Sequence, residues 1–170
     1  TAPQAAPDAD PPPAGGSTPD PGIATPDLDN LRISVDGWRT DFTKASVPFG
    51  DFLGGGPPKD GTPAIDSPGY ESIADARSWL ADRSPVISLE IDGVARAYPL
   101  AILMWHEIVN DTLGDTPVVV TFCPLCNTAL VFERRLEGTT YDFGTTGNLR
   151  FSDLVMYDRQ TETRWQQANG

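Results

Sequence analysis

The chain has 170 residues and a formal charge of −12, because 24 acidic residues stand against 12 basic ones. This length suits one well-packed domain, and so anionic a chain is repelled by phosphate backbones, so we expect no nucleic-acid binding. No run of apolar residues approaches the roughly 18 that a membrane span needs. Two of the basic residues are lysines, Lys44 and Lys59. This Asp-rich, Lys-poor composition favours a halophilic source, since high salt screens the repulsion between acidic side chains.

Residues 1–30 have a composition of their own. They hold eight prolines, six alanines and five aspartates without one Lys or Arg, which predicts a disordered tether ahead of a single β-rich domain at residues 31–170. Such tethers commonly follow the lipidated N-terminal cysteine of an exported lipoprotein, and a plain interdomain linker is the alternative. On the first interpretation the protein is extracytoplasmic and lipid-anchored, and that anchor is its one contact with the membrane.

Turn signals divide the rest of the chain into short β-rich segments. Asp36-Gly37, Asp92-Gly93 and, more weakly, Glu137-Gly138 stand between such segments and predict hairpins, because glycine accepts the positive φ of a tight turn. The stretch GGGPPKDGTP, residues 54–63, is typical of a loop, and two later strands are expected at 154–158 and 161–167.

Two helices are expected. Ser72 can cap a helix over 73–81, with Asp75 as the acid of a capping box, and Ile73, Ala76 and Leu80 would form its buried stripe.

The second helix would run over 99–109, PLAILMWHEIV, with a proline in its first turn. It is apolar nearly all round, which predicts that it is buried, and residues 110–117 would form a loop after it. The predicted fold class is therefore α+β and β-dominated, with antiparallel hairpins and two short helices, one of them buried.

The two cysteines, Cys123 and Cys126, lie in TFCPLCNTALVF directly after the apolar run VVVTF. A Cys-x-x-Cys pair can be a redox couple whose first thiolate is stabilised by nearby amides, half of a metal site, or an inert local disulfide. Pro124 removes one of those amides and stiffens the turn. A thioredoxin fold is not expected, because the βαβ pattern around such a pair is missing.

His106 is the one histidine of the chain. A lone histidine on an apolar helix is more often a hydrogen-bonded core residue than a ligand. With Cys123 and Cys126 it would make a Cys2His set, which with a carboxylate or water could hold zinc, or copper through its soft thiolates. We expect His106 to come within about one side-chain length of the cysteine turn, since the loop at 110–117 is short.

Four stretches together carry a resemblance to a known family: PPKDGTPAIDSP, ARAYPLAILMWHEIVND, VTFCPLCNTALVF and FGTTGNLRFSDLVMYDRQTETRWQQ. Over residues 31–170 the chain resembles the bacterial and archaeal family named domain of unknown function 3179. The resemblance implies an exported or lipid-anchored protein. It also implies a reactive cysteine pair, because some members carry selenocysteine in the FCPLC box, and a family domain that continues beyond the WQQ segment.

The last of these stretches holds a polar group of its own: Arg150, Ser152, Asp153, Asp158 and Arg159. These residues would form turn and cross-strand pairs, or else Arg150 or Arg159 would lie near the cysteines and lower a thiol pKa. Tyr157 and Trp165 are expected in the core.

The leading interpretation is an extracytoplasmic thiol-redox protein in which Cys123 and Cys126 react and His106 carries protons. Its partner would be a protein or a small redox molecule, and the sequence assigns it no definite cofactor. A zinc or copper protein using the same three residues is the first alternative. A tethered structural or ligand-binding module with an inert disulfide is the second.

Overall fold

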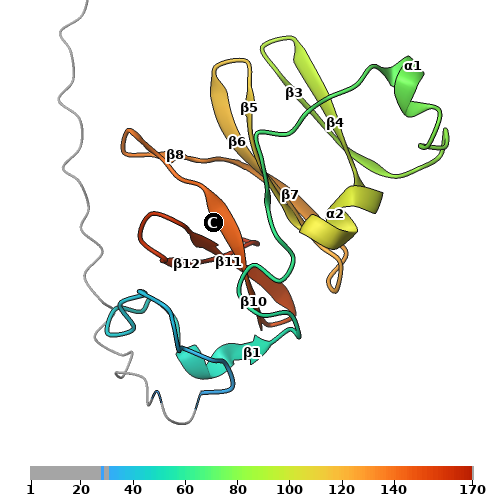
Figure 1. The fold of residues 1–170 in the computed structure, drawn as a ribbon. Coiled ribbons are helices and arrows are strands. Elements are labelled where there is room, and N and C mark those ends of the chain that lie inside the picture. The colour runs from blue at the N-terminus through green and yellow to red at the C-terminus, as the bar shows by residue number, and fades with distance from the viewer. Residues whose placement is uncertain (1–27, 29–30, 170) are drawn as a thin grey trace, which may run out of the picture.

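The computed structural model describes Leu28 and residues 31–169, so the tether predicted for residues 1–30 lies, apart from Leu28, outside the described residues. Two four-stranded sheets dominate the fold (Figure 1). The first sheet has the order β1-β10-β11-β12: β1 (Phe52–Gly54), β10 (Phe143–Arg150), β11 (Asp153–Asp158), β12 (Arg164–Gln166). The second has the order β2-β5-β6-β7: β2 (Ile65–Asp66), β5 (Ile108–Leu113), β6 (Thr116–Cys123), β7 (Thr128–Glu133).

Two hairpins and three short helical segments complete the described part. They are β3 (Val86–Ile91) with β4 (Val94–Pro99), β8 (Arg135–Leu136) with β9 (Thr139–Thr140), the 3-10 turn Phe49–Asp51, α1 (Ile73–Ala76) and α2 (Leu100–His106). Every strand pair is antiparallel except β2 with β5. The prediction of a β-dominated α+β fold with antiparallel hairpins and two helices is confirmed.

Strand β6 lies in the middle of the core, and its side chains point alternately to two sides. Val118, Val120 and Phe122 pack with Leu103 of α2 and Tyr98 of β4. On the opposite side, Val119 and Cys123 pack with residues of β10 and β11. The order of layers is therefore the β3–β4 hairpin with α2, then the second sheet, then the first sheet.

The outer face of the first sheet is covered by the segment that precedes β1. Ile33 and Phe49 are buried there together with Phe52 of β1 and Val155 of β11. The hairpin predicted around Asp36-Gly37 is wrong: the turn forms, with Gly37 at φ +76°, but no strand flanks it. This segment covers the sheet with its side chains instead of pairing along its own backbone.

The other two turn predictions are confirmed. Asp92 and Gly93 have φ values of 51° and 77°, and Glu137 and Gly138 have 50° and 79°. Positive φ at both central residues is the geometry that matches the twist of paired strands.

Helix α1 is shorter than predicted. Ser72 caps it and accepts the N–H of Asp75, as expected, but α-helix ends at Ala76 and single turns continue to Leu80. The expected buried stripe is wrong at Ile73, which is 81% exposed. Four helical residues are too few to bury a face.

Helix α2 ends at His106, three residues earlier than predicted, because Ile108 and Val109 join β5. The predicted burial holds for Leu103, which is 1% exposed, while Met104 and Trp105 are 51% and 75% exposed. The helix is thus apolar nearly all round, but only one of its sides packs against the core. Within the described residues, no helix has the length and apolar character to cross a membrane.

The loop predicted at 110–117 is wrong as well. Asn110 to Leu113 belong to β5, Thr116 opens β6, and Gly114 with φ +60° makes the two-residue turn between them. Leu113 is fully buried and Asp111 is 7% exposed, so tertiary packing determines the structure of a stretch whose composition resembles a loop.

The loop that follows β1 packs tightly on β10 at Gly147. Gly55 donates its N–H to the carbonyl oxygen of Gly147 at 2.7 Å, and a Cβ on Gly147 would overlap the carbonyl oxygen of Pro57. Gly147 has φ +69° and lies at a β-bulge between Thr145 and Asn148. Loop and strand can therefore meet here only if residue 147 has no side chain.

We expect Gly147→Ala to lower the free energy of unfolding by at least about 3 kcal/mol, because steric overlap adds to the unfavourable φ. Gly138→Ala is the matched control, since Gly138 also has positive φ but no atom within 4 Å of its Cβ position; it should cost about 1 kcal/mol. Denaturant unfolding measures both. Equal losses for the two variants would contradict the packing argument.

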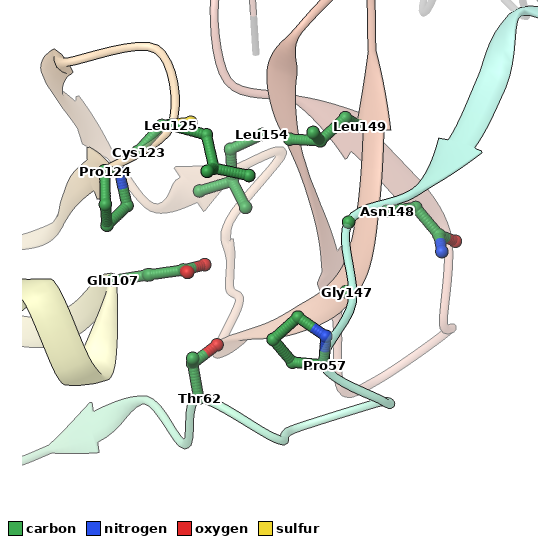
Figure 2. Close-up of a pocket in the computed structure, with 11 residues that line it drawn as sticks. Pro57, Thr62, Glu107, Cys123, Pro124, Leu125, Gly147, Asn148, Leu149 and Leu154 are labelled. Atoms are coloured by element: carbon green, nitrogen blue, oxygen red, sulfur yellow. The ribbon is translucent and has the colours of Figure 1, made fainter.

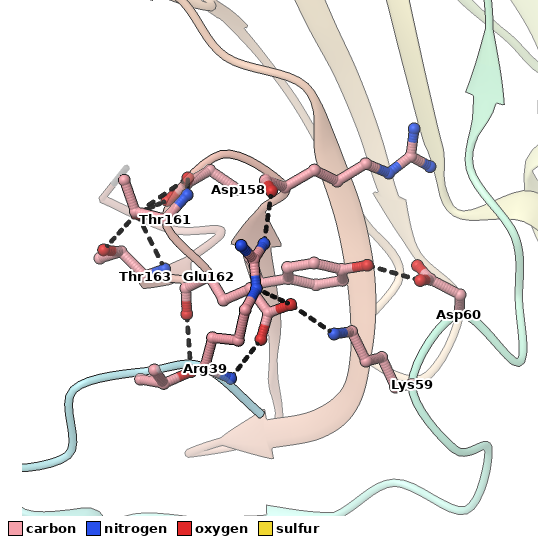
Figure 3. Close-up of polar contacts among 10 residues, drawn as sticks. Arg39, Lys59, Asp60, Asp158, Thr161, Glu162 and Thr163 are labelled. Carbon is pink, nitrogen blue, oxygen red and sulfur yellow. Dashed lines mark hydrogen bonds and ion pairs between the residues drawn. The ribbon is translucent and has the colours of Figure 1, made fainter. Parts of the chain in front are cut away.

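A buried ion cluster attaches the segment around Arg39 to the loop around Lys59 (Figure 3). The side chain of Glu162 is buried, with the residue 6% exposed. Its carboxylate oxygens accept hydrogen bonds from the Lys59 ammonium, at 2.9 Å, and from the backbone N–H of Arg39, at 2.6 Å. Burial alone would raise the pKa of Glu162, but the hydrogen bonds from Lys59 and Arg39 outweigh it and hold the pKa at about 2.

The lowered pKa predicts a pH-dependent effect of Glu162→Gln. The stabilisation that the carboxylate provides is present above its ordinary pKa and is lost as the pH falls toward 2. At pH 7 the variant should lose on the order of 3 kcal/mol, since one pKa unit corresponds to about 1.4 kcal/mol. Unfolding measured between pH 2 and pH 7 tests this, with Glu90→Gln on the exposed face of β3 as the charge-matched control. A loss that stays constant over this range would contradict the prediction.

Candidate functional site

Cys123 and Cys126 form a disulfide bond, with their Cα atoms 5.5 Å apart. Cys123 is the last residue of β6 and pairs with Thr128, the first residue of β7. The four residues between them make a tight turn in which Asn127 has φ +49°. The disulfide therefore joins the last residue of β6 to the third residue of the turn that follows this buried strand.

The two cysteines differ in their surroundings. Cys123 is 2% exposed and belongs to the core cluster between the sheets, whereas Cys126 is half-buried at the edge of that cluster. Leu125 between them is 70% exposed. The Cys126 N–H donates to the Cys123 sulfur at 3.4 Å. Cys123 is thus in the core and its sulfur accepts a backbone amide, whereas Cys126 is partly exposed.

Gln167 forms hydrogen bonds to both strands that flank the cysteine turn. Gln167 is fully buried, and its Nε2 donates to the hydroxyl of Thr121 at 2.9 Å and to the carbonyl oxygen of Thr128 at 3.1 Å. The backbone N–H of Gln167 donates to Leu154 of β11. These bonds attach both strands that carry the turn to the first sheet.

A cavity of about 30 Å³ lies beside Cys123 (Figure 2). Its walls come from the cysteine turn, from β10 and β11, from the loop at 55–62, and from Glu107 at the end of α2. Figure 2 shows the Glu107 carboxyl pointing into this space, with Pro124 and Leu125 on one side and Thr62 on the other. Burial raises the pKa of the Glu107 carboxyl, and a hydrogen bond with Thr62 opposes that rise.

His106 has a different environment. Its Nδ1 lies 2.8 Å from the carbonyl oxygen of Pro63, and its side chain is not among those that line the cavity at Cys123. Among the residues that the structure describes, no group of three or more His, Cys, Asp or Glu side chains is placed to hold a metal ion. The Cys2His set with a further carboxylate is therefore not assembled in the described part of the chain.

The two arginines of the polar group in the stretch FGTTGNLRFSDLVMYDRQTETRWQQ make ion pairs with aspartates. Arg150 contacts Asp51 at 3.2 Å and the side-chain oxygen of Gln166 at 2.7 Å. Arg159 contacts Asp66 at 2.6 Å. Neither arginine is among the residues that line the cavity at Cys123.

The other residues of that polar group lie in turns or form hydrogen bonds that stabilise them. Ser152 is exposed, at φ +64° in the turn between β10 and β11, and Asp153 accepts the backbone N–H of Ala168 at 2.9 Å. Asp158 is fully buried and accepts the hydroxyl of Thr161 and, at 2.9 Å, the indole N–H of Trp165. Tyr157 is 3% exposed and Trp165 packs on the core, as expected.

Sequence reasoning missed Glu107 as a neighbour of the cysteines. A continuous helix over 99–109 would point Glu107 away from His106 and leave it without a site. The positive φ of 60° at Glu107 redirects the chain, and its carbonyl oxygen accepts the N–H of Phe122 next to Cys123. The pairing of Ile108 with Thr121, which makes a hairpin of β5 and β6, was the missing information.

Comparison with curated proteins and with solved structures finds no match. A family model described as "Protein of unknown function (DUF3179)" matches residues 59–170. The match covers the second part of the loop after β1, both α-helices and the cysteine turn, and it begins later than the expected residue 31. Since it spans more than half of the chain, the expected family is confirmed, and the protein belongs to the DUF3179 family.

Proposed function

We propose that the protein is an extracytoplasmic thiol–disulfide redox protein whose working pair is Cys123 and Cys126. The observation that carries this proposal is the unequal exposure of the two bonded cysteines. A partner thiolate can approach the half-buried Cys126, while Cys123 is 2% exposed and has the N–H of Cys126 on its sulfur. The rate of thiol–disulfide exchange depends on access to the sulfur that is attacked, and Cys126 is the more exposed of the two cysteines.

The exchange step follows from this geometry. A thiolate of a dithiol partner attacks the sulfur of Cys126, forms a bond to it and breaks the bond to Cys123, which leaves with the electron pair. The second thiol of the partner then attacks the partner's own sulfur in the mixed disulfide and releases Cys126 as a thiolate. The partner is oxidised to a disulfide, and the protein gains two electrons and, at the end, two protons.

The order of the cysteines in this scheme is set by their burial. Attack on Cys123 would require the partner sulfur to enter the core cluster that Cys123 shares with Ile108 and Phe143. Cys126 is therefore proposed as the residue that carries the mixed disulfide. Cys123 is the leaving group when the disulfide is reduced, and it attacks the mixed disulfide in the reverse direction.

A disulfide also fits an extracytoplasmic location, because such bonds persist in oxidising compartments and are rare in the cytosol. That location is part of the proposal, together with a partner that is either a protein dithiol or a small thiol.

An inert structural disulfide is the competing function, and the core position of Cys123 favours it. Its energetic benefit would be small. In the loop-entropy model a disulfide that closes a loop this short stabilises the folded chain by about 2 kcal/mol, against about 5 kcal/mol for a loop of 100 residues. A redox role gives a better account of two cysteines placed three residues apart.

A redox titration tests the proposal. The folded protein is equilibrated in dithiol buffers of graded potential, and free thiols are labelled. We expect one reversible two-electron transition, in which a tenfold change in the ratio of reduced to oxidised protein takes about 30 mV. A disulfide that opens only when the protein unfolds would establish the inert structural role instead.

Two single-cysteine variants test which sulfur is attacked. Cys123→Ser leaves the half-buried Cys126 as a free thiol, and Cys126→Ser leaves the buried Cys123. We expect the Cys126 thiol of the first variant to react with an aromatic disulfide reagent at least about tenfold faster, because exchange rates depend on access to the sulfur. In denaturant the two rates should become similar. Faster reaction of Cys123 in the folded protein would reverse the proposed order.

A further inference from the structure

Glu107 occupies a backbone position that is fixed on both sides. Its N–H donates to the carbonyl oxygen of Leu103 at 2.9 Å, closing α2, and its own carbonyl oxygen accepts the N–H of Phe122 at 2.8 Å, opening the pairing with β6. Between these bonds Glu107 has φ +60°, a conformation that costs a residue with a side chain about 1 kcal/mol or more. An unfavourable conformation held in this way is a reason to look for a function of the side chain it directs.

The side chain is directed into the cavity beside the buried sulfur (Figure 2). Cys123 and Glu107 both line this cavity, and its volume of about 30 Å³ is enough for one or two water molecules. The two residues therefore share one cavity, and that cavity has room for a bridging water.

No other group that titrates competes for this role within the cavity. Besides the two named residues, the walls are glycine and proline with Thr62 from the loop at 55–62, Pro124 and Leu125 from the cysteine turn, and glycine, asparagine and leucine from β10 and β11. His106, the neighbour of Glu107 in the chain, contacts Pro63 instead. Burial raises the pKa of Glu107, so the carboxyl holds its proton to a higher pH than an exposed glutamate does.

We propose that Glu107 is the proton carrier for Cys123, and that His106 is not; this proposal rests on the redox function proposed above. When a partner thiolate bonds to the sulfur of Cys126, Cys123 leaves with the electron pair and takes the proton of the Glu107 carboxyl, which becomes a carboxylate. In the reverse direction the carboxylate removes the proton of the Cys123 thiol. The resulting thiolate attacks Cys126 in the mixed disulfide, the disulfide closes, and the partner leaves as a thiolate.

The test is the rate of reduction of the full chain by dithiothreitol, measured across pH and divided by the concentration of dithiothreitol thiolate. In the wild type this normalised rate should fall as the pH rises and Glu107 ionises. In Glu107→Gln it should be at least about tenfold lower at the acidic end and independent of pH, since general acid catalysis typically contributes a hundredfold or more. His106→Gln, the matched control from the adjacent residue, should keep the rate and the pH profile of the wild type.

Unfolding measurements exclude a trivial loss of structure. Because burial raises the pKa of Glu107, the folded state binds more protons than the unfolded state, so wild-type stability falls as the pH rises through this range. Glu107→Gln removes that cost and should be at least as stable as the wild type at neutral pH.

The outcomes separate the two proposals. A disulfide that does not cycle reversibly in the wild type overturns both the redox function and the role of Glu107. A wild type that cycles, but whose normalised rate does not change with pH and equals that of Glu107→Gln, overturns the role of Glu107 alone. A change in pH profile in His106→Gln would assign the proton to His106 instead.

Discussion

The burial of β6 on both faces is the constraint on which the rest of the structure depends. Its backbone is paired on one side by β5 and on the other by β7, and its side chains alternate between two cores. Alternation assigns Cys123 to the core between the sheets, where its exposure is 2%. Because the strand ends at that residue, the turn that follows brings Cys126 back toward the surface within three positions. The difference between the two sulfurs is thus a consequence of strand geometry.

The same strand determines where α2 ends. Ile108 and Val109 are β-branched and apolar, and in β5 they are fully or almost fully buried and pair with Thr121 and Val120 of β6. A helix that continued through these residues would leave β6 without a partner on this side. The transition from helix to strand therefore falls on Glu107, which has a φ of 60° and lines the same cavity as Cys123.

Local signals in the sequence predicted what depends on neighbouring residues alone. The Asp92-Gly93 turn and the Ser72 cap are such features, and both form as expected. The Asp36-Gly37 turn carries the same signal, yet no strands flank it, because whether a segment pairs or covers a sheet depends on distant residues such as Val155. For the same reason the apolar pattern of α2 could not indicate that Trp105 faces solvent. The cysteine pair was predictable as a site, whereas the placement of Glu107 required the pairing of β5 with β6.

The distribution of cations in the described part bears on the chemistry of the disulfide. Arg150, Arg159 and Lys59 each form an ion pair with a carboxylate, and none of the residues that line the cavity at Cys123 is basic. A thiolate left in that cavity would have one backbone amide and no positive charge to stabilise it, and a buried charge without a partner is costly. The charge on Cys123 must therefore be neutralised by a proton as the disulfide opens. Glu107 is the titratable group that shares this cavity, so under the proposed redox function the burial of the sulfur would couple electron transfer to proton transfer.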